Sequence, residues 1–349
     1  MEASELPTHI HLVGSIGLHD SSEVFRTVGR LFGRRLKRVP DGEPAGRALW
    51  VSWQYPVLNA NPFLAPSGAI NSSTKIPLIG LAPGVRPEDL KFGELGYARE
   101  ARASYQDFLA ARDRGDIAPG TRFQISMPTP FEVLFVFADR SQIDAIEPAY
   151  ERAFIAEVEA ICAAIPHRDL CIQWDICHQM VIWDGQSEFL RYPVWTDIEK
   201  EVTTRLERLC RAVPDDVELG FHLCYGDYKA RHFVDPRDAG ALVEVANAIA
   251  RHVSHRIAYI HMPVPIARSD DAYFAPLAKL ALPSTTEVYL GLVHADGAEA
   301  NQRRLQAARK YLRSFGVATE CGMARARVSE VVNAMLKSHL HVCREPASG

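Results

Sequence analysis

Residues 217–225 read Val-Glu-Leu-Gly-Phe-His-Leu-Cys-Tyr, a mostly apolar run that ends with an imidazole and a thiol two positions apart. A nearly continuous apolar run of this length is typical of a strand buried on both faces, as in a parallel sheet covered by helices. Side chains two apart on a strand point to the same side, so His222 and Cys224 face one common space. The stretch therefore predicts a buried parallel strand with reactive groups at its carboxyl end.

Similar runs recur along the chain and alternate with longer amphipathic stretches, which is the pattern of parallel βα units. Eight strands are predicted, over residues 9–17, 36–43, 121–128, 169–177, 217–225, 256–264, 287–294 and 316–322. Helices are predicted over residues 22–31, 143–164, 198–212, 238–252, 298–314 and 327–339. This alternation predicts an α/β fold, a (β/α)₈ TIM barrel that forms a single domain over residues 1–349.

Residues 44–120 interrupt the alternation. They contain a Pro-, Asn- and Ser-rich stretch at 55–77 and a helical run at 94–114, and they predict a long insertion after the second strand. In a barrel, such a segment leaves the carboxyl end of a strand and lies over the catalytic face. The insertion either takes part in function or is only a structural extension of the fold, and the sequence is compatible with both.

Composition limits the class of protein. The sequence is 47% hydrophobic and 23% charged with a net charge of -4, which is ordinary for a globular enzyme and disfavours a nucleic-acid partner. No apolar stretch is long enough to span a bilayer, and residues 1–9 lack the pattern of a signal peptide. The 7 cysteines are an odd number without the spacing of a disulfide scaffold. We therefore expect a cytoplasmic protein with reduced thiols and no membrane partner.

Polar and reactive side chains stand at the ends of the predicted strands, where barrel enzymes place their active sites. In chain order they are Ser15, Glu43, the turn at 127–130, Asp175, His222 with Cys224, His261, His294 and Cys321. Sulfur and nitrogen ligands from different strand ends are what a catalytic zinc site requires. Cys177 and His178 are a competing pair, although adjacent strand residues face opposite ways. Each of these residues also has an interpretation without a functional role. The cysteines would be packing residues, the histidines hydrogen-bonded core residues, and the carboxylates acceptors for loop amides.

These strand ends resemble motifs of the catalytic barrel of cobalamin-independent methionine synthases, which belong to one barrel superfamily with uroporphyrinogen decarboxylases. The segments that resemble this family are Val13-Gly14-Ser15-Ile16, Asp41-Gly42-Glu43-Pro44, Ile172-Gln173-Trp174-Asp175, His222-Leu223-Cys224-Tyr225 and Glu320-Cys321-Gly322-Met323-Ala324-Arg325. His294 falls where the family keeps a histidine that handles a proton. The resemblance implies a Zn²⁺ cofactor bound by His222, Cys224 and Cys321. It also implies that Ser15, Glu43 and Asp175 bind the substrate.

The chain departs from this pattern at positions that concern the substrate. The family's remaining zinc ligand is usually a glutamate, whereas this chain has His261. A neutral imidazole can also bind zinc, so His261 is a weaker candidate for this ligand. The tryptophan that the family uses against the folate pterin corresponds to Leu134. Trp50, Trp53 and Tyr55 enter the insertion directly after Glu43, where they either form the wall of a site for an apolar alkyl donor or attach the insertion to the barrel. Trp53 is the one expected to bind the substrate.

The expected function is zinc-dependent transfer of a methyl or alkyl group to or from a small-molecule thiol, with Glu43, Asp175 and His294 as catalytic residues. One alternative is a metal-free lyase that resembles uroporphyrinogen decarboxylase. Another is a barrel that binds a thiol or a metal without turnover. The alkyl donor, the thiol acceptor and the oligomeric state are left open by the sequence.

Overall fold

The computed structural model describes residues 6–346. Its central element is a parallel sheet of seven strands, in the order β1-β4-β5-β6-β7-β8-β9. These strands are β1 (Arg38–Pro40), β4 (Arg122–Pro128), β5 (Leu170–Ile176), β6 (Glu218–Leu223), β7 (Ile257–Pro263), β8 (Glu287–Gly291) and β9 (Gly316–Val317). Each strand pairs in parallel with its neighbour, so all their carboxyl ends lie at one edge. The predicted α/β organisation with a parallel sheet is confirmed.

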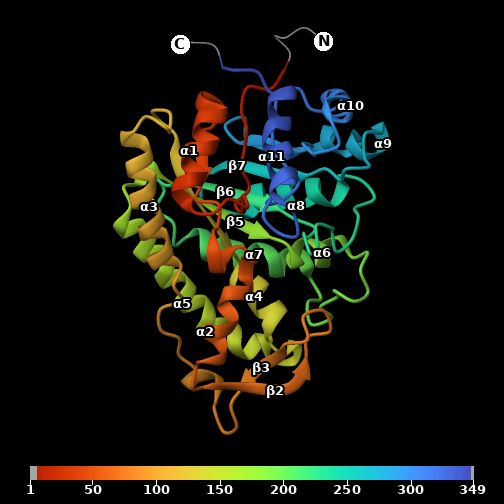
Figure 1. The fold of residues 1–349 in the computed structure, drawn as a ribbon. Helices are drawn as coiled ribbons and strands as arrows, with labels where there is room; N and C mark the ends of the chain where they lie inside the picture. Colours follow the sequence, from red (N-terminus) through yellow and green to blue (C-terminus); the bar gives the residue numbers. More distant parts are fainter. Residues whose placement is uncertain (1–5, 347–349) are drawn as a thin grey trace.

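The helices of residues 6–346 surround the sheet or lie beyond it, toward the end of the molecule away from the two termini (Figure 1). They are α1 (Ser21–Phe32), α2 (Tyr55–Asn59), α3 (Tyr97–Asp113), α4 (Pro130–Phe137), α5 (Ile143–Ala164), α6 (His178–Asp184), α7 (Ile198–Cys210), α8 (Gly240–His252), α9 (Asp271–Phe274), α10 (Ala298–Arg309) and α11 (Ser329–Ser338). The strands β5 and β7 are buried along their whole length, which explains their mostly apolar sequence. Among residues 6–346, no helix combines the length and apolar character that a membrane crossing needs.

The strand predicted at residues 9–17 is wrong as a continuous strand. Within this segment only Ile10 forms bridges, in parallel with both Leu36 and Val317. Leu36 lies just before β1 and Val317 lies in β9, so one residue touches both edge strands of the sheet. The sheet is therefore curled, with its two edges held near each other by the segment around Ile10.

Side chains replace the missing strand ladder after Ile10. The Val13 carbonyl accepts hydrogen bonds from Gln173 Nε2 at 2.6 Å and from Ser126 Oγ at 2.9 Å. The Leu12 carbonyl accepts from Gln124 Nε2 at 3.0 Å. Because buried carbonyls need a donor of any kind, these side chains of β4 and β5 satisfy the segment without strand pairing.

Glycines make room for two large side chains inside the curled sheet. A Cβ on Gly220 would lie 2.2 Å from the ring of Tyr259, and a Cβ on Gly316 would lie 2.3 Å from the ring of Tyr289. Neither distance is compatible with another residue unless a ring moves. The rings therefore fill the interior beneath the carboxyl edge.

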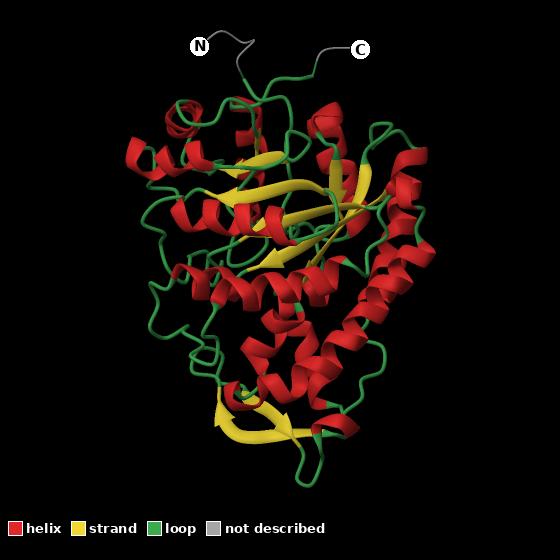
Figure 2. Ribbon diagram, turned by 180° about the vertical axis from the view of Figure 1, so that it is seen from behind, coloured by secondary structure: helices red, strands yellow, loops and turns green. Residues whose placement is uncertain are grey.

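Between β1 and β4 the chain forms α2, the antiparallel hairpin of β2 (Leu64–Ile70) and β3 (Pro77–Leu81), and α3. The hairpin lies at the end of the molecule opposite the two termini and beneath α2 and α4 (Figure 1), as the reverse view also shows (Figure 2). Asn71 Nδ2 donates to the Val136 carbonyl at 2.8 Å, which ties the hairpin to α4. The Pro-, Asn- and Ser-rich stretch at 55–77 is thus largely ordered secondary structure.

Candidate functional site

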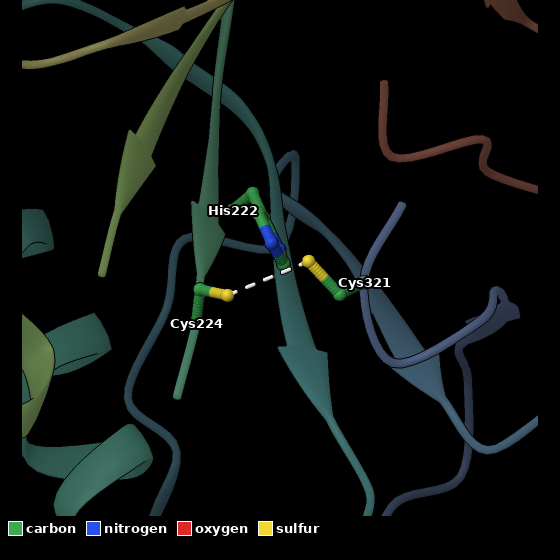
Figure 3. A group of neighbouring side chains, drawn as sticks. All are labelled: His222, Cys224 and Cys321. Atoms are coloured by element: carbon green, nitrogen blue, oxygen red, sulfur yellow. Dashed lines mark hydrogen bonds between the residues drawn. The ribbon is translucent and has the colours of Figure 1, made fainter. Parts of the chain in front are cut away.

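Three of the predicted zinc ligands converge at the carboxyl edge of the sheet. His222 lies in β6, Cys224 directly follows it, and Cys321 lies in the loop after β9. Their ligand atoms all lie within 4.8 Å of one another, and the side chains point toward one another in Figure 3. The strands β6 and β9 are not neighbours in the sheet, so the curl of the sheet brings these residues together.

The distance between the two sulfurs indicates what this group can hold. Cys224 Sγ and Cys321 Sγ lie 3.6 Å apart. A disulfide requires about 2.05 Å, whereas two thiolates at about 2.3 Å from a tetrahedral zinc stand about 3.8 Å from each other. The spacing therefore fits a shared metal ion, and the three donors leave room for one exchangeable ligand.

A chain of hydrogen bonds determines which nitrogen of His222 is left without a hydrogen-bond partner. The Thr319 carbonyl can only accept, so His261 Nε2, at 3.0 Å, donates to it. In the neutral imidazole His261 Nδ1 then accepts, and His222 Nδ1 donates to it at 2.7 Å. Burial lowers the pKa of His261 to about 3, which keeps this ring neutral. His222 Nε2 remains a buried lone pair without a hydrogen-bond partner in the described part of the chain, the form that binds a metal.

His261 itself does not join the converging ligands. Both of its ring nitrogens are engaged, with His222 and with Thr319, and the group of closely spaced ligand atoms contains His222, Cys224 and Cys321 without it. The structure thus turns both ring nitrogens of His261 toward other partners, and its place as a zinc ligand stays a prediction.

The thiols have donors that would stabilise their ionised form. The pKa of Cys224 is raised well above its usual value, mainly by its hydrogen bond with Cys177, and that of Cys321 mainly by its hydrogen bond with Cys224. The Gly226 amide donates to Cys224 Sγ at 3.2 Å, and Arg325 donates to Cys321 Sγ at 3.4 Å. Both thiols are thus protonated when no metal ion is bound. The Gly226 amide and Arg325 already provide the hydrogen bonds that would stabilise the thiolates once a metal ion binds.

Glu43 and Asp175 face one cavity together with the three converging ligands. Burial raises the pKa of Glu43 to about 7, against the opposing charge of Arg325. Burial, and next the charge of Glu43, raise the pKa of Asp175 well above its usual range. Glu43 also has a positive φ of 49°, a strained conformation of the kind found at functional sites. The pair retains a proton near neutral pH, which suits proton transfer.

We expect the pKa of Glu43 to make stability depend on pH. A carboxyl group with a higher pKa in the folded chain binds more protons when folded, so the free energy of unfolding falls as pH rises from 4.5 to about 7. Glu43→Gln should remove much of this fall and stabilise the protein at about pH 8 by roughly 1–2 kcal/mol, after allowance for solvent screening. Urea unfolding at several pH values measures it. The exposed Glu299, changed to Gln, is the control, and an unaltered pH slope in Glu43→Gln contradicts the expectation.

Ser15 lies against the loop that carries Cys321. Its carbonyl accepts from the Met323 amide at 2.7 Å, and a Cβ on Gly322 would lie 2.1 Å from Ser15 Oγ. A larger residue at position 322 would therefore require the Ser15 hydroxyl to move. Ser15 Oγ is buried, has no partner within residues 6–346, and its residue lines the cavity, so the hydroxyl is available to a bound molecule.

The tryptophans after Glu43 differ from the expectation. Trp53 packs edge-on against Tyr97 with ring centroids 4.7 Å apart, and it lines a smaller cavity beside Glu100 instead of the large one. Trp50 lines the large cavity and packs against a cysteine cluster formed by Cys177, Cys224 and Cys321. Because Trp53 packs against Tyr97 of α3, Trp50 lines the large cavity and Trp53 does not.

His294 is not brought to the lining of this cavity. Its Nε2 donates to the Val264 carbonyl at 2.9 Å, and its backbone amide donates to Asn301 Oδ1 at 2.9 Å. Burial lowers its pKa to about 4. Its role in handling a proton stays a prediction.

Glu132 of α4 was missed by the sequence analysis. Its carboxylate accepts from the backbone amides of Cys177, His178 and Gln179, and also contacts His178 Nδ1 at 2.7 Å. Glu132, Cys177 and His178 form a second group of closely spaced ligand types. Since these hydrogen bonds already occupy both carboxylate oxygens, we assign the group to capping the amino terminus of α6. No local signal in α4 shows which distant amides this glutamate meets.

Comparison with known proteins supports the fold. No protein-family model and no curated protein matches the sequence. A structure from Listeria monocytogenes, provisionally assigned as a vitamin-B12-independent methionine synthase, has a TM-score of 0.59, 12% identity and 97% coverage of each chain. A B12-independent methionine synthase from Shewanella sp. W3-18-1, in complex with selenomethionine, has a TM-score of 0.58, 15% identity and 96% coverage of each chain. At these identities the similarity shows a shared α/β fold over nearly the whole chain.

Proposed function

We propose that this protein transfers a methyl or larger alkyl group to or from a small-molecule thiol, with zinc bound by His222, Cys224 and Cys321. The observation that carries the proposal is the pair of sulfurs 3.6 Å apart, within 4.8 Å of a ring nitrogen of His222, whose Nε2 has no partner in the described part of the chain. A zinc ion bound there would lower the pKa of a substrate thiol so that it ionises at neutral pH and remains nucleophilic.

The chain's own residues would position the substrate and manage charge. Arg325, beside Cys321 Sγ, would offset the negative charge of the thiolates. Ser15 Oγ and Asp175 would bind the polar part of the substrate. Glu43, whose pKa is raised to about 7, would accept or return a proton near neutral pH.

Two features of the fold and sequence support this proposal. Two solved structures that share the fold are named as B12-independent methionine synthases, so thiol methylation is a chemistry that this fold can carry. Leu134, in place of the tryptophan that would face a pterin, is fully buried in the core. It offers no aromatic surface to a folate, which favours a different alkyl donor.

We also propose that the segment around Ile10 completes an eight-stranded barrel within a single domain over residues 1–349, with residues 44–120 as its insertion. Ile10 donates to the Arg35 carbonyl at 2.9 Å, and His11 donates to the Val317 carbonyl at 2.9 Å. These bonds to both edges support closure. Residues 1–5 and 347–349 lie outside the described residues.

Elemental analysis of the protein purified without added metal tests the proposed function. We expect about one zinc per chain, together with zinc-dependent alkylation of a thiol substrate. Protein that contains no zinc, binds none on addition and still catalyses a decarboxylation would favour the metal-free lyase. Protein with zinc that alkylates no thiol in a survey of donors would favour a binding protein.

We expect His261→Ala to weaken zinc binding by about 10- to 100-fold, because His222 would lose the partner that selects its tautomer. The stoichiometry should stay the same, and competition with a chelator measures the affinity. His261→Gln is the matched variant, since its amide can donate to the Thr319 carbonyl and accept from His222 Nδ1. Recovery of affinity in His261→Gln supports the positioning role. Equal losses in both variants would indicate that His261 binds the metal directly.

A further inference from the structure

A large cavity lies between the carboxyl edge of the sheet and the β2–β3 hairpin. Its volume is about 1010 Å³, and its lining includes Cys224 and Cys321 at one end and the hairpin residues Ile70 and Ile76 at the other. Small-molecule sites usually occupy roughly 300–1,000 Å³. Transfer of a methyl group to a short thiol needs only a small part of this space, so the rest of the cavity calls for an additional explanation.

Exposed apolar side chains gather at this cavity. Phe189 is 90% exposed and Ile70 is 62% exposed, and both line it. The other exposed large apolar residues in its lining are Leu49, Tyr228 and Phe233. They come from four separate connections: after β1, at the end of β2, between α6 and α7, and after β6. Single exposed apolar residues are ordinary, but their convergence on one cavity marks a binding site.

A wall of aromatic side chains connects these residues with the cysteine cluster. Trp50 packs against the cysteine cluster and stacks on His178 with ring centroids 6.2 Å apart. The His178 ring lies 4.8 Å from Phe135 and 5.2 Å from Phe233. The apolar surface is therefore continuous from the candidate metal centre to the mouth of the cavity.

The charges in the cavity disfavour an anionic occupant. Its two arginines are already engaged within the described structure. Arg140 lies 4.3 Å over the Phe135 ring and donates to the Phe189 carbonyl at 3.0 Å, and Arg325 donates to Cys321 Sγ. The acidic residues Glu43, Asp139, Asp175 and Asp227 also line the cavity. A phosphate- or carboxylate-bearing group along the aromatic wall would find no free cation.

We propose that the substrate is an apolar thioether or thiol, whose sulfur lies at the cysteine cluster and whose long alkyl or aromatic body fills the aromatic corridor to the cavity mouth. This inference rests on the proposed function, and it names the substrate class of the same site. Apolar burial would provide most of the binding affinity, while the polar groups at the floor would orient the sulfur.

Binding of n-alkyl methyl sulfides with butyl to decyl chains, measured by calorimetry, tests the inference. Each buried methylene should tighten binding by about two- to fourfold. Phe189→Ser and Ile70→Ser should each weaken binding of the decyl sulfide by about five- to tenfold, with little effect on the butyl sulfide or on zinc content. Ile266→Ser is the matched control, because Ile266 is 53% exposed and does not line the cavity; it should bind the decyl sulfide as the wild type does.

The same titrations with Cys224→Ser separate this inference from the metal site. A chain-length dependence that persists in this variant supports the apolar corridor whether or not zinc is bound. The inference is overturned if the affinity for the sulfides does not change with chain length. It is also overturned if Phe189→Ser and Ile70→Ser both bind the decyl sulfide as tightly as the wild type does. A third result would also overturn it: sedimentation that shows a wild-type dimer and a monomeric Phe189→Ser variant whose sulfide affinity is unchanged. The apolar residues at the cavity mouth would then form an interface with a second copy of the chain.

Discussion

Zinc content should fall from about one per chain to nearly none in Cys224→Ser, Cys321→Ser and His222→Ala. Each substitution removes one of three donors that lie within 4.8 Å of one another, and a zinc ion held by two protein ligands exchanges readily with a chelator. Thiol alkylation should fall with it by about thirtyfold or more, because only about 3% of a thiol with a pKa near 8.5 is ionised at pH 7 without the metal.

Cys162→Ser is the matched control for the cysteine variants. Cys162 is also buried, but it lies in α5, away from the carboxyl edge of the sheet, so zinc content and alkylation should stay at wild-type levels. Cobalt substitution gives a second measurement, since the thiolate-to-metal absorption band should weaken in Cys224→Ser and Cys321→Ser and persist in Cys162→Ser. Full zinc retention by all three ligand variants would remove the basis of the proposed function.

Glu132→Ala should lower the free energy of unfolding by about 3–5 kcal/mol. Glu132 is fully buried, and its loss would leave three backbone amides at the start of α6 without acceptors. Glu132→Gln should cost less, because its remaining carbonyl oxygen still accepts. Chemical denaturation measures both changes.

Glu159 provides the control for Glu132, because it is an exposed glutamate on the neighbouring helix α5. Glu159→Ala should change the free energy of unfolding by no more than about 0.5 kcal/mol. A cost of less than about 1 kcal/mol for Glu132→Ala would mean that water replaces the carboxylate at these amides, and the capping role would then be wrong.

Local sequence determined most of the sheet and much of the candidate centre. The strand ends of β5, β6 and β7 lie within the ranges predicted from apolar runs, and α5 (Ile143–Ala164) has the predicted ends. His222 and Cys224 could be predicted to share a face, because the period of two along a strand is a local property of the chain. Cys321 could be grouped with them only because parallel strands place their carboxyl ends at one edge.

Only the tertiary structure decided the rest, because the deciding contacts join residues distant in sequence. The carbonyls after Ile10 are satisfied by side chains of β4 and β5, which no local pattern of residues 9–17 reveals. His261 turns toward His222 and Thr319, whereas its position at a strand end made it only a weaker candidate for a metal ligand. Packing against Tyr97 draws Trp53 away from the cavity. Residue type and spacing determine which groups stand at the edge, while burial and long-range hydrogen bonds decide what each group faces.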